Sequence, residues 1–405
     1  MSRLLQRPQF VILGSVVMSF NMSACYMAIP LLAKERLGAG PVLLGCYAFF
    51  LNAAYFALAL GAGAISRRFG LRAMLSAGAV SCLACNAGML VCPNKYLVFI
   101  PCLLYSVTAG LYWPAMEAAN AEGQTPRQIK RGVGYFCYAW MAGSMAGFFF
   151  GGWLYNLTDP PAQALFGLNI ALMVVLWRWT RSGALERIAP WRAAPREEEA
   201  VSASKRALFV QLGLLSNFGM YMGASCVRSL LPEYAHASGL TGFPYGLLMA
   251  ALILGMVAGN SLLRAWHGWH YSGRILIGGQ LVAVGALLWF SFTKSYAGLC
   301  LSQVVFGVAM ALSYFSSIYY GMENREDKSE HGGQHEAVIA AGMGITPVFG
   351  GMLIAATAWP RSAFVAVAVL LFISALVQSG WMARARGRRP APPVGIAQPV
   401  EAEAS

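Results

Sequence analysis

Twelve apolar segments, each about as long as a bilayer core is thick, follow one another along this chain of 405 residues. A helix needs roughly 20 mainly apolar residues to cross that core. Because lipid offers no partner for free backbone N–H and C=O groups, such segments cross as helices whose hydrogen bonds are all internal. The sequence therefore predicts an all-α membrane protein with twelve transmembrane helices, which we expect at 10–33, 41–66, 73–92, 96–121, 132–156, 163–181, 207–231, 243–266, 275–294, 296–322, 335–358 and 361–383.

Composition supports this prediction, because 58% of the residues are apolar and only 11% are charged. An ordinary soluble domain has about 45–50% apolar and about 25% charged residues. The first apolar run, 10–33, is too long for the apolar core of a signal peptide, so we expect it to remain as a span. Nine cysteines lie mostly inside apolar runs, where they are expected to be small buried side chains.

Two polar stretches divide the chain. We predict an N-terminal six-helix bundle at 1–181, a cytoplasmic linker at 182–206, a C-terminal six-helix bundle at 207–383 and a disordered cytoplasmic tail at 384–405. Similar short sequences recur in the same order in the two halves, such as the paired glycines at 151–152 and 350–351. Two pseudo-symmetric bundles of this kind would place a solute site between them, near the bilayer midplane.

The distribution of Lys and Arg predicts the orientation. Of the 29 basic residues, 23 fall in the terminal segments and the even-numbered connections with their adjoining span ends, and five fall in the other connections. Cytoplasmic loops are the ones enriched in Lys and Arg, so we expect both termini in the cytoplasm of a protein in the cell (inner) membrane. This dispersed charge also argues against a nucleic-acid partner, which would need a single basic face. The bilayer is the expected partner, and we expect a monomer.

The connection between the second and third spans resembles a signature of the major facilitator superfamily. Residues 63–72 read GAISRRFGLR, similar to the G-x-x-x-D-R-x-G-R-R of that family at the same loop, with Gly63, Arg67, Arg68, Gly70 and Arg72 at signature positions. Residues 147–152 (GFFFGG) resemble the G-P-x-x-G-G of the fifth span without its proline, and residues 346–351 (TPVFGG) keep the proline. The resemblance covers about residues 10–383. It implies a transporter whose two bundles rock about a central site, with the signature loop controlling the conformational change.

Departures from the family pattern affect the expected mechanism. The acid of the loop signature is replaced by Arg67, and the family's arginine of the fourth span is Ser106, with Gln303 at the matching place of the second half. The only carboxylates within the expected spans, Glu117 and Glu336, fall near cytoplasmic ends. We therefore expect no central acid, which leaves proton coupling without support and a coupling proton or cation open. A cavity of this kind suits neutral or amphiphilic solutes.

Glu117 and Glu336 are gating candidates. By the resemblance, the signature loop lies against the start of the eleventh span, so Arg67 and Glu336 could form a swapped ion pair that latches the cytoplasmic side. The alternative is that both face solvent and headgroups, where ion pairs contribute little. Glu117 could be a gate or a proton carrier, or an interfacial carboxylate paired with Lys130 or Arg131.

Polar and aromatic residues in the middle of the expected spans are candidates for lining the central cavity. Each Asn could instead join neighbouring helices, since amides in hydrocarbon need partners. Arg228, in the seventh span, could bind an anionic solute, but we expect its long side chain to reach the headgroups. The cavity candidates are Asn21, Asn52, Tyr112, Tyr138, Asn217, Tyr221 and Tyr314.

The resulting hypothesis is a secondary transporter that moves a small organic solute by alternating access, with the fifth-span motif favouring efflux. The alternatives are an uncoupled facilitator or uptake carrier for a neutral metabolite, and, from other classes, a membrane-embedded enzyme or a transporter-like sensor. We expect no enzyme, since no nucleophile–base or acid-pair constellation shares one depth in the spans. No cofactor is implied. His331 and His335 lack a third ligand at zinc-motif spacing, so no metal site is predicted.

Overall fold

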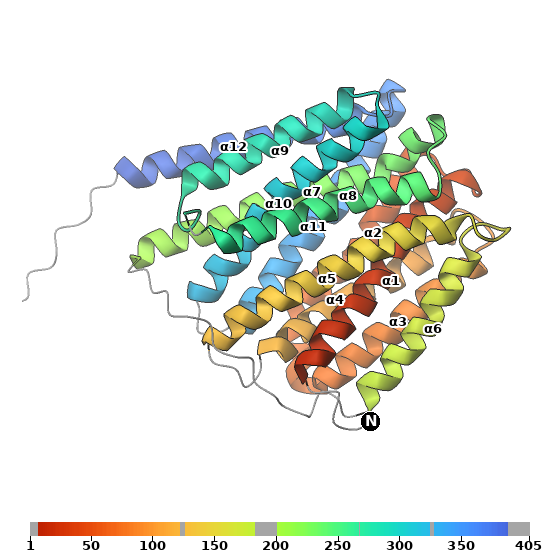
Figure 1. Cartoon of the computed structure of the whole chain (residues 1–405), viewed down its shortest axis with the longest axis horizontal. Helices are drawn as coiled ribbons and strands as arrows, with labels where there is room; N and C mark the ends of the chain where they lie inside the picture. Colours follow the sequence, from red (N-terminus) through yellow and green to blue (C-terminus); the bar gives the residue numbers. More distant parts are fainter. Residues whose placement is uncertain (1–6, 122–125, 183–200, 267, 325–327, 388–405) are drawn as a thin grey trace, which may run out of the picture.

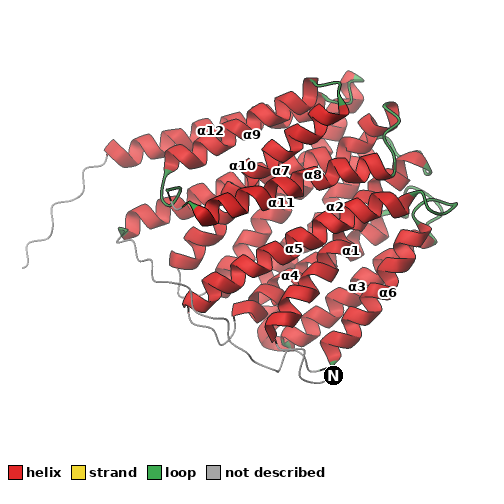
Figure 2. Ribbon diagram, in the orientation of Figure 1, coloured by secondary structure: helices red, strands yellow, loops and turns green. Residues whose placement is uncertain are grey.

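The computed structural model describes residues 7–121, 126–182, 201–266, 268–324 and 328–387. Within these ranges the regular structure is entirely helical, and twelve helices are long and apolar enough to cross a membrane (Figure 2). The prediction of an all-α protein with twelve spans is therefore confirmed. The helices are α1 (Arg7–Glu35), α2 (Pro41–Phe69), α3 (Leu71–Leu90), α4 (Phe99–Ala121), α5 (Pro126–Tyr155), α6 (Gln163–Arg181), α7 (Ala203–Ala237), α8 (Phe243–Ala265), α9 (Gly273–Phe292), α10 (Tyr296–Asn324), α11 (Lys328–Thr357) and α12 (Ser362–Gly387).

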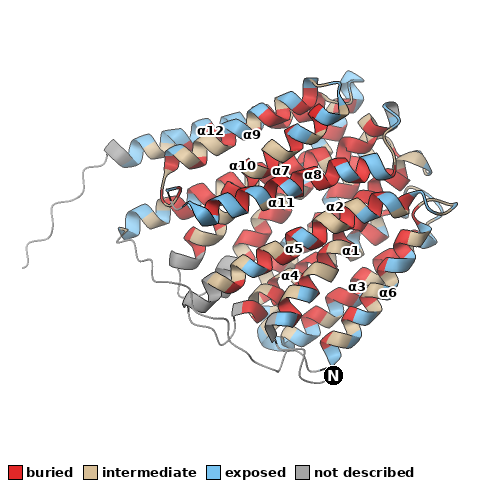
Figure 3. Cartoon of the chain, viewed as in Figure 1, coloured by how far each residue is buried: buried red, intermediate tan, exposed pale blue. Residues whose placement is uncertain are grey.

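Large apolar side chains cover the outside of the helix bundle, as lipid contact requires. On α12, one run of exposed residues is wholly aliphatic or aromatic, while the opposite face is buried (Figure 3). A soluble protein rarely exposes a continuous apolar surface of this size. The protein is therefore an integral multi-pass membrane protein. The exposed α12 residues are Val369, Leu370, Phe372, Ile373, Leu376 and Val377.

Each half of the chain packs mainly on itself, and two helix pairs make the main contacts between the halves. Helices α3 and α6 lie together at one side of the molecule, and α9 and α12 at the opposite side (Figure 1). Between them, α2 packs along α11 and α5 packs along α8. Because the helices alternate in direction, α1 begins and α12 ends at the same face of the bundle. We call it the terminal face, and the opposite one the distal face.

Glycines allow the α5–α8 pair to approach closely near the distal face. A Cβ on Gly152 would lie 2.7 Å from the carbonyl oxygen of Gly242 and 2.8 Å from the Cα of Gly246. A Cβ on Gly246 would in turn lie 2.7 Å from the Cα of Gly152. Small residues in membrane helices permit such backbone contacts. Near the distal face, the α5–α8 seam is therefore built for contact between backbones.

We expect Gly152→Val to lower the melting temperature of the purified protein clearly. The added methyl groups would meet backbone atoms that cannot move aside, and overpacking of this kind costs about 1–3 kcal/mol or more. Gly285→Val on α9 is the matched control, since a Cβ on Gly285 would project into open space with no neighbouring helix within 4 Å. Equal melting temperatures for the two variants would contradict close packing at this seam.

Helix α11 begins earlier than its apolar run, which changes the position of Glu336. The sequence predicted a span at 335–358 with Glu336 at its start, whereas the helix begins at Lys328. Glu336 therefore lies about 12 Å along the helix axis from its first residue, at 1.5 Å per residue. Its hydrogen-bond partner Tyr55 is the middle residue of α2 (Pro41–Phe69). Glu336 is therefore packed against the middle of α2, although it stays near the start of the candidate span Gly333–Thr357.

Some predictions concern residues outside the described ranges. Most of the predicted linker 182–206 and of the predicted tail 384–405 lies there, as does the side chain of Lys130, one of the two suggested partners of Glu117. The other suggested partner, Arg131, donates a hydrogen bond of 3.3 Å to the hydroxyl of Tyr135 on its own helix.

Candidate functional site

Aromatic rings from both halves of the chain meet around Tyr314 on α10. Its ring centre lies 5.5 Å from that of Trp140 on α5 and 6.4 Å from that of Tyr221 on α7. The imidazole of His335 on α11 lies 5.2 Å away, and its Nδ1 is 2.9 Å from the hydroxyl of Ser317. Tyr314 is 4% exposed. Two of the predicted cavity residues, Tyr221 and Tyr314, are thus brought together, on helices that also contact the other half.

Glu117 lies on the terminal side of this aromatic cluster. It is within electrostatic range of Cys137, Tyr221 and Tyr314, on α5, α7 and α10 respectively. Two of these residues, Tyr221 and Tyr314, belong to the other half of the chain.

A second cluster, on the distal side, surrounds Arg228 of α7. Its guanidinium carbon lies 5.4 Å from the ring centre of Phe148 on α5, which is buried. The phenols of Tyr26, Tyr105 and Tyr221 lie within electrostatic range of it. The side chain therefore points across to the N-terminal half, and our expectation that it reaches the headgroups is wrong. We call Arg228, Tyr26, Tyr105, Tyr221 and Phe148 the Arg228 cluster.

The hydroxyl of Tyr26 ties α1 to α7 beside Arg228. It lies 3.0 Å from the hydroxyl of Ser225 and 3.2 Å from that of Ser229. Ser225 also donates to the carbonyl of Met343 on α11, at 2.6 Å. The wall of the cluster is thus polar at one edge and aromatic elsewhere.

Asn217 lies four residues before Tyr221, on the same face of α7. Its side chain is fully buried, and neither amide atom has a hydrogen-bond partner among the described residues. A buried amide without partners is costly, so this position suits an amide that bonds a solute or water.

Asn21 and Tyr112 lie inside the N-terminal half, away from these clusters. The amide of Asn21 donates to the carbonyl of Asn169 on α6 at 3.0 Å, and its oxygen accepts from Asn86 on α3 at 3.1 Å. Tyr112 is fully buried with its ring against Gly78 of α3 and its hydroxyl directed at Gly14 of α1. For Asn21, these contacts favour the alternative role of joining helices.

Asn52 and Tyr138 lie at the two seams between the halves. Asn52 of α2 donates to the carbonyl of Ala48 at 2.8 Å and packs beside Gly344 of α11. The hydroxyl of Tyr138 on α5 lies 3.0 Å from that of Ser261 on α8. Arg264 of α8 covers the Tyr138 ring, with its guanidinium carbon 5.4 Å from the ring centre.

The signature loop turns sharply at the terminal face. Gly70 joins α2 to α3 with a φ of +79°, a conformation that favours glycine. Gly63 lies in the last two turns of α2, Arg67 and Arg68 are exposed, and Arg68 lies 5.2 Å over the ring of Phe69.

The predicted latch between Arg67 and Glu336 is not formed in this structure. Glu336 is 5% exposed and accepts a hydrogen bond from the hydroxyl of Tyr55, whereas Arg67 is at the surface and has no ion pair with a described residue. The added two turns of α11 carry Glu336 away from the loop. The α2–α11 seam is thus closed by Tyr55 and Glu336.

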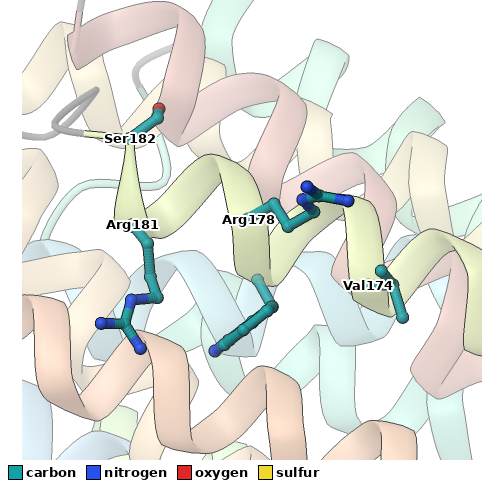
Figure 4. Close-up of a pocket in the computed structure, with 5 residues that line it drawn as sticks. Val174, Arg178, Arg181 and Ser182 are labelled. Atoms are coloured by element: carbon teal, nitrogen blue, oxygen red, sulfur yellow. The ribbon is translucent and has the colours of Figure 1, made fainter.

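A surface recess of about 410 Å³ lies at the terminal end of α6, remote from both clusters (Figure 4). Arg178 and Arg181 extend in different directions along it, and Arg72 of α3 donates to the carbonyl of Arg181. Its lining residues all belong to one face of α6 and its end, so it lies on the surface and not between the halves. They are Val174, Trp177, Arg178, Arg181 and Ser182.

Sequence reasoning missed several residues of the central region. Tyr26, Tyr105 and Trp140 are aromatic residues in mid-span, but so are many residues that only pack in the core. Nothing in the sequence indicated a functional role for Tyr55, because its partner Glu336 was expected at a helix end. The one feature of the sequence that indicated a residue of the central region was a charge within an expected span, and that residue is Arg228.

The family model described as Major Facilitator Superfamily matches residues 11–334 of this chain. A search of curated proteins found no match.

Proposed function

Because the chain belongs to the major facilitator superfamily, a family of secondary transporters, we propose that it exports a small amphiphilic organic solute by alternating access. In this proposal residues 1–181 and 207–383 are the two rocking bundles, and the terminal face is cytoplasmic. The protein acts as a monomer in the cell membrane. The direction rests on the resemblance of residues 147–152 to the fifth-span motif of exporters.

The observation that carries the proposal is the pair of seams joining the halves. Helices α2 with α11 and α5 with α8 are the main contacts between residues 7–182 and 201–387. Polar side chains meet at both seams, through Tyr55 with Glu336 and Tyr138 with Ser261. Such contacts can break and re-form as the rigid bundles rock, because water can solvate the polar groups that a broken contact exposes.

Trp140, Tyr221 and His335, the rings around Tyr314, form with it what we call the Tyr314 cluster. Between the seams, this cluster and the Arg228 cluster form a continuous column, because Tyr221 belongs to both. Its rings suit the apolar body of a solute, and its hydroxyl and amide groups suit the polar end. In this proposal, the column is the solute site near the bilayer midplane that transporters built from two such bundles use.

We expect that joining Tyr138→Cys to Ser261→Cys with a short, reducible bis-methanethiosulfonate cross-linker will reduce transport to background. A linker is needed because loss of the Tyr138 ring leaves a gap too wide for a direct disulfide. The cross-link would hold α5 against α8 near the terminal face and so prevent that side from opening. Ser216→Cys with Ser313→Cys is the matched control, because those hydroxyls are also close, 2.6 Å apart, but belong to α7 and α10 of one half. The measurement is counterflow of a labelled solute in proteoliposomes, before and after reduction.

The solute for this assay comes from a thermal-shift screen of the purified protein against a broad library, since a ligand that binds the folded state raises its melting temperature. Restoration of counterflow by reductant in the 138–261 variant, with the control active throughout, supports rocking at this seam. Full counterflow by the cross-linked 138–261 protein would contradict it. Hits that bind without counterflow in the unmodified protein would favour the sensor alternative.

A further inference from the structure

We propose that the solute is an organic anion with an apolar body, and that Arg228 binds its carboxylate or sulfonate group. This inference rests on the proposed function and specifies the chemistry of its central site. It departs from the neutral solute expected from the sequence, because it depends on where the Arg228 side chain points.

Arg228 lies between the two halves, at a depth where the space belongs either to a solute path or to a tight contact between helices. It is five residues before Glu233, which pairs with Lys34 of α1 near the distal face, and therefore about 7.5 Å deeper along α7. The hydrogen bonds between the hydroxyl of Tyr26 and those of Ser225 and Ser229 place this part of α7 directly against α1. The guanidinium itself reaches α5, where it lies over Phe148.

The charge of Arg228 has no counter-ion among the residues that the structure describes. No hydrogen bond or ion pair of its guanidinium is present there, and its Nε is buried without a partner. Two acids of the distal side are engaged elsewhere, Glu233 with Lys34 at 2.8 Å and Glu35 with the hydroxyl of Tyr155 at 2.8 Å.

An arginine in this position cannot relieve its charge by losing a proton, because guanidinium stays protonated in proteins. An unpaired charge in a protein interior is strongly unfavourable, and charged residues inside membrane proteins mark ligand and ion paths by default. An anion supplied by the solute would provide the missing partner, and the guanidinium fork matches a carboxylate with two parallel hydrogen bonds.

The surroundings define the rest of the ligand. The guanidinium lies over the ring of Phe148, and the phenols of Tyr26, Tyr105 and Tyr221 are within its electrostatic range. The rings of Tyr26 and Tyr105 are tilted against each other, with centres 6.0 Å apart. Aromatic walls favour an apolar or aromatic body next to the anionic group. A cation would meet the positive charge of Arg228, and a neutral solute would leave that charge unpaired. The cluster therefore selects amphiphilic anions.

The test is a thermal-shift panel of matched pairs on the full-length protein in detergent. Each aromatic or aliphatic carboxylate and sulfonate is paired with its neutral carboxamide or sulfonamide, and amines of the same skeletons complete the panel. We expect the compounds that stabilise the protein to be anions, with their neutral counterparts inactive. Arg228→Gln should bind these anions roughly 10- to 100-fold more weakly, as expected for losing hydrogen bonds to a charged group. Arg228→Lys should lose less, and the surface variant Arg178→Gln should behave as the unmodified protein.

A second readout separates binding from folding. Ligand-free Arg228→Gln should melt at the same temperature as the unmodified protein or higher, because it removes an uncompensated charge. A large decrease in that temperature would show that Arg228 holds the fold together, which overturns the proposal. It is also overturned if anions are not enriched among the stabilising compounds, or if Arg228→Gln binds them undiminished. If neutral compounds bind and undergo counterflow independently of Arg228, the anion proposal fails while the transporter proposal stands.

Discussion

Reversing the charge of either Lys34 or Glu233 should open the distal side of the protein, and reversing both should close it again. Lys34 Nζ on α1 and Glu233 Oε2 on α7 lie 2.8 Å apart, and their side chains are only 19% and 10% exposed. The pair joins helices from the two halves of the chain. It therefore holds the halves together only while the distal side is closed.

The expected effect is large because the pair is mostly shielded from water. A hydrogen bond to a charged group contributes about 1.5–3 kcal/mol. A loss of about 2 kcal/mol from the distally closed state changes its equilibrium with the open state about 30-fold. Repulsion in the single variants Lys34→Glu and Glu233→Lys adds to this loss, whereas the double variant restores an attractive pair.

The opening can be measured as the labelling rate of a cysteine at Ser229 by a membrane-impermeant maleimide. Ser229 is fully buried and bonded to Tyr26 in the closed structure. Cys46, Cys92 and Cys300, the three partly exposed native cysteines, are replaced first.

Tyr155→Phe is the matched control for this measurement, because it removes a 2.8 Å bond to Glu35 within one half. It should leave the labelling rate unchanged. Slow labelling in both single variants would show that the ion pair does not hold the distal side closed.

The sequence was sufficient for the number of spans but not for what faces the centre. Apolar runs of about 20 residues predict spans because the bilayer sets their length. They do not set where a helix begins. Helix α11 begins at Lys328 and continues through polar residues, so Glu336 lies inside the helix and not in its first turn. Lys34 and Glu233 are 199 residues apart, and nothing in the local sequence of either residue indicates its partner.

The sequence also did not predict the direction in which each side chain points. Tyr221 and Tyr314, both mid-span aromatics, meet between the halves, whereas Tyr112, a candidate on the same grounds, points into the N-terminal half. Arg228 is recognisable as a charge within a span, but only the contact with Phe148 shows that it points inward. Periodicity fixes the face of a helix and leaves open which neighbour that face meets.

Glu336→Gln should abolish proton-driven accumulation of the solute while leaving its exchange intact. Glu336 is a buried carboxyl group on α11, hydrogen-bonded by Tyr55 at a seam that must open for transport. The cationic side chain expected beside it, Arg67, lies at the surface. The neighbouring His335 contacts Ser317 and Tyr314, and Glu117 faces Tyr314. A carboxyl group in such a seam can take up a proton on one side and release it on the other as its exposure alternates.

The size of the effect follows from thermodynamics. A gradient of one pH unit supplies about 1.4 kcal/mol per proton, which supports at most a tenfold accumulation of solute when one proton is coupled. For an exporter that exchanges solute for protons, the solute accumulates on the acidic side of the membrane. Glu336→Gln keeps the acceptor for Tyr55 and the size of the side chain, but it cannot carry a proton, so accumulation should fall to the uncoupled ratio of one. Counterflow, which needs no proton movement, should stay within about twofold, since the hydrogen bond to the seam is retained.

The assay compares both quantities in proteoliposomes with an imposed pH gradient. Tyr55→Phe should keep accumulation, because it removes the hydrogen bond and leaves the carboxyl group. Glu117→Gln tests the other carboxylate that faces the central region. If accumulation survives in Glu336→Gln and disappears in Glu117→Gln, the proton is carried by Glu117, at the terminal side of the Tyr314 cluster. If the unmodified protein itself never exceeds a ratio of one, transport is uncoupled and Glu336 serves only to close the α2–α11 seam.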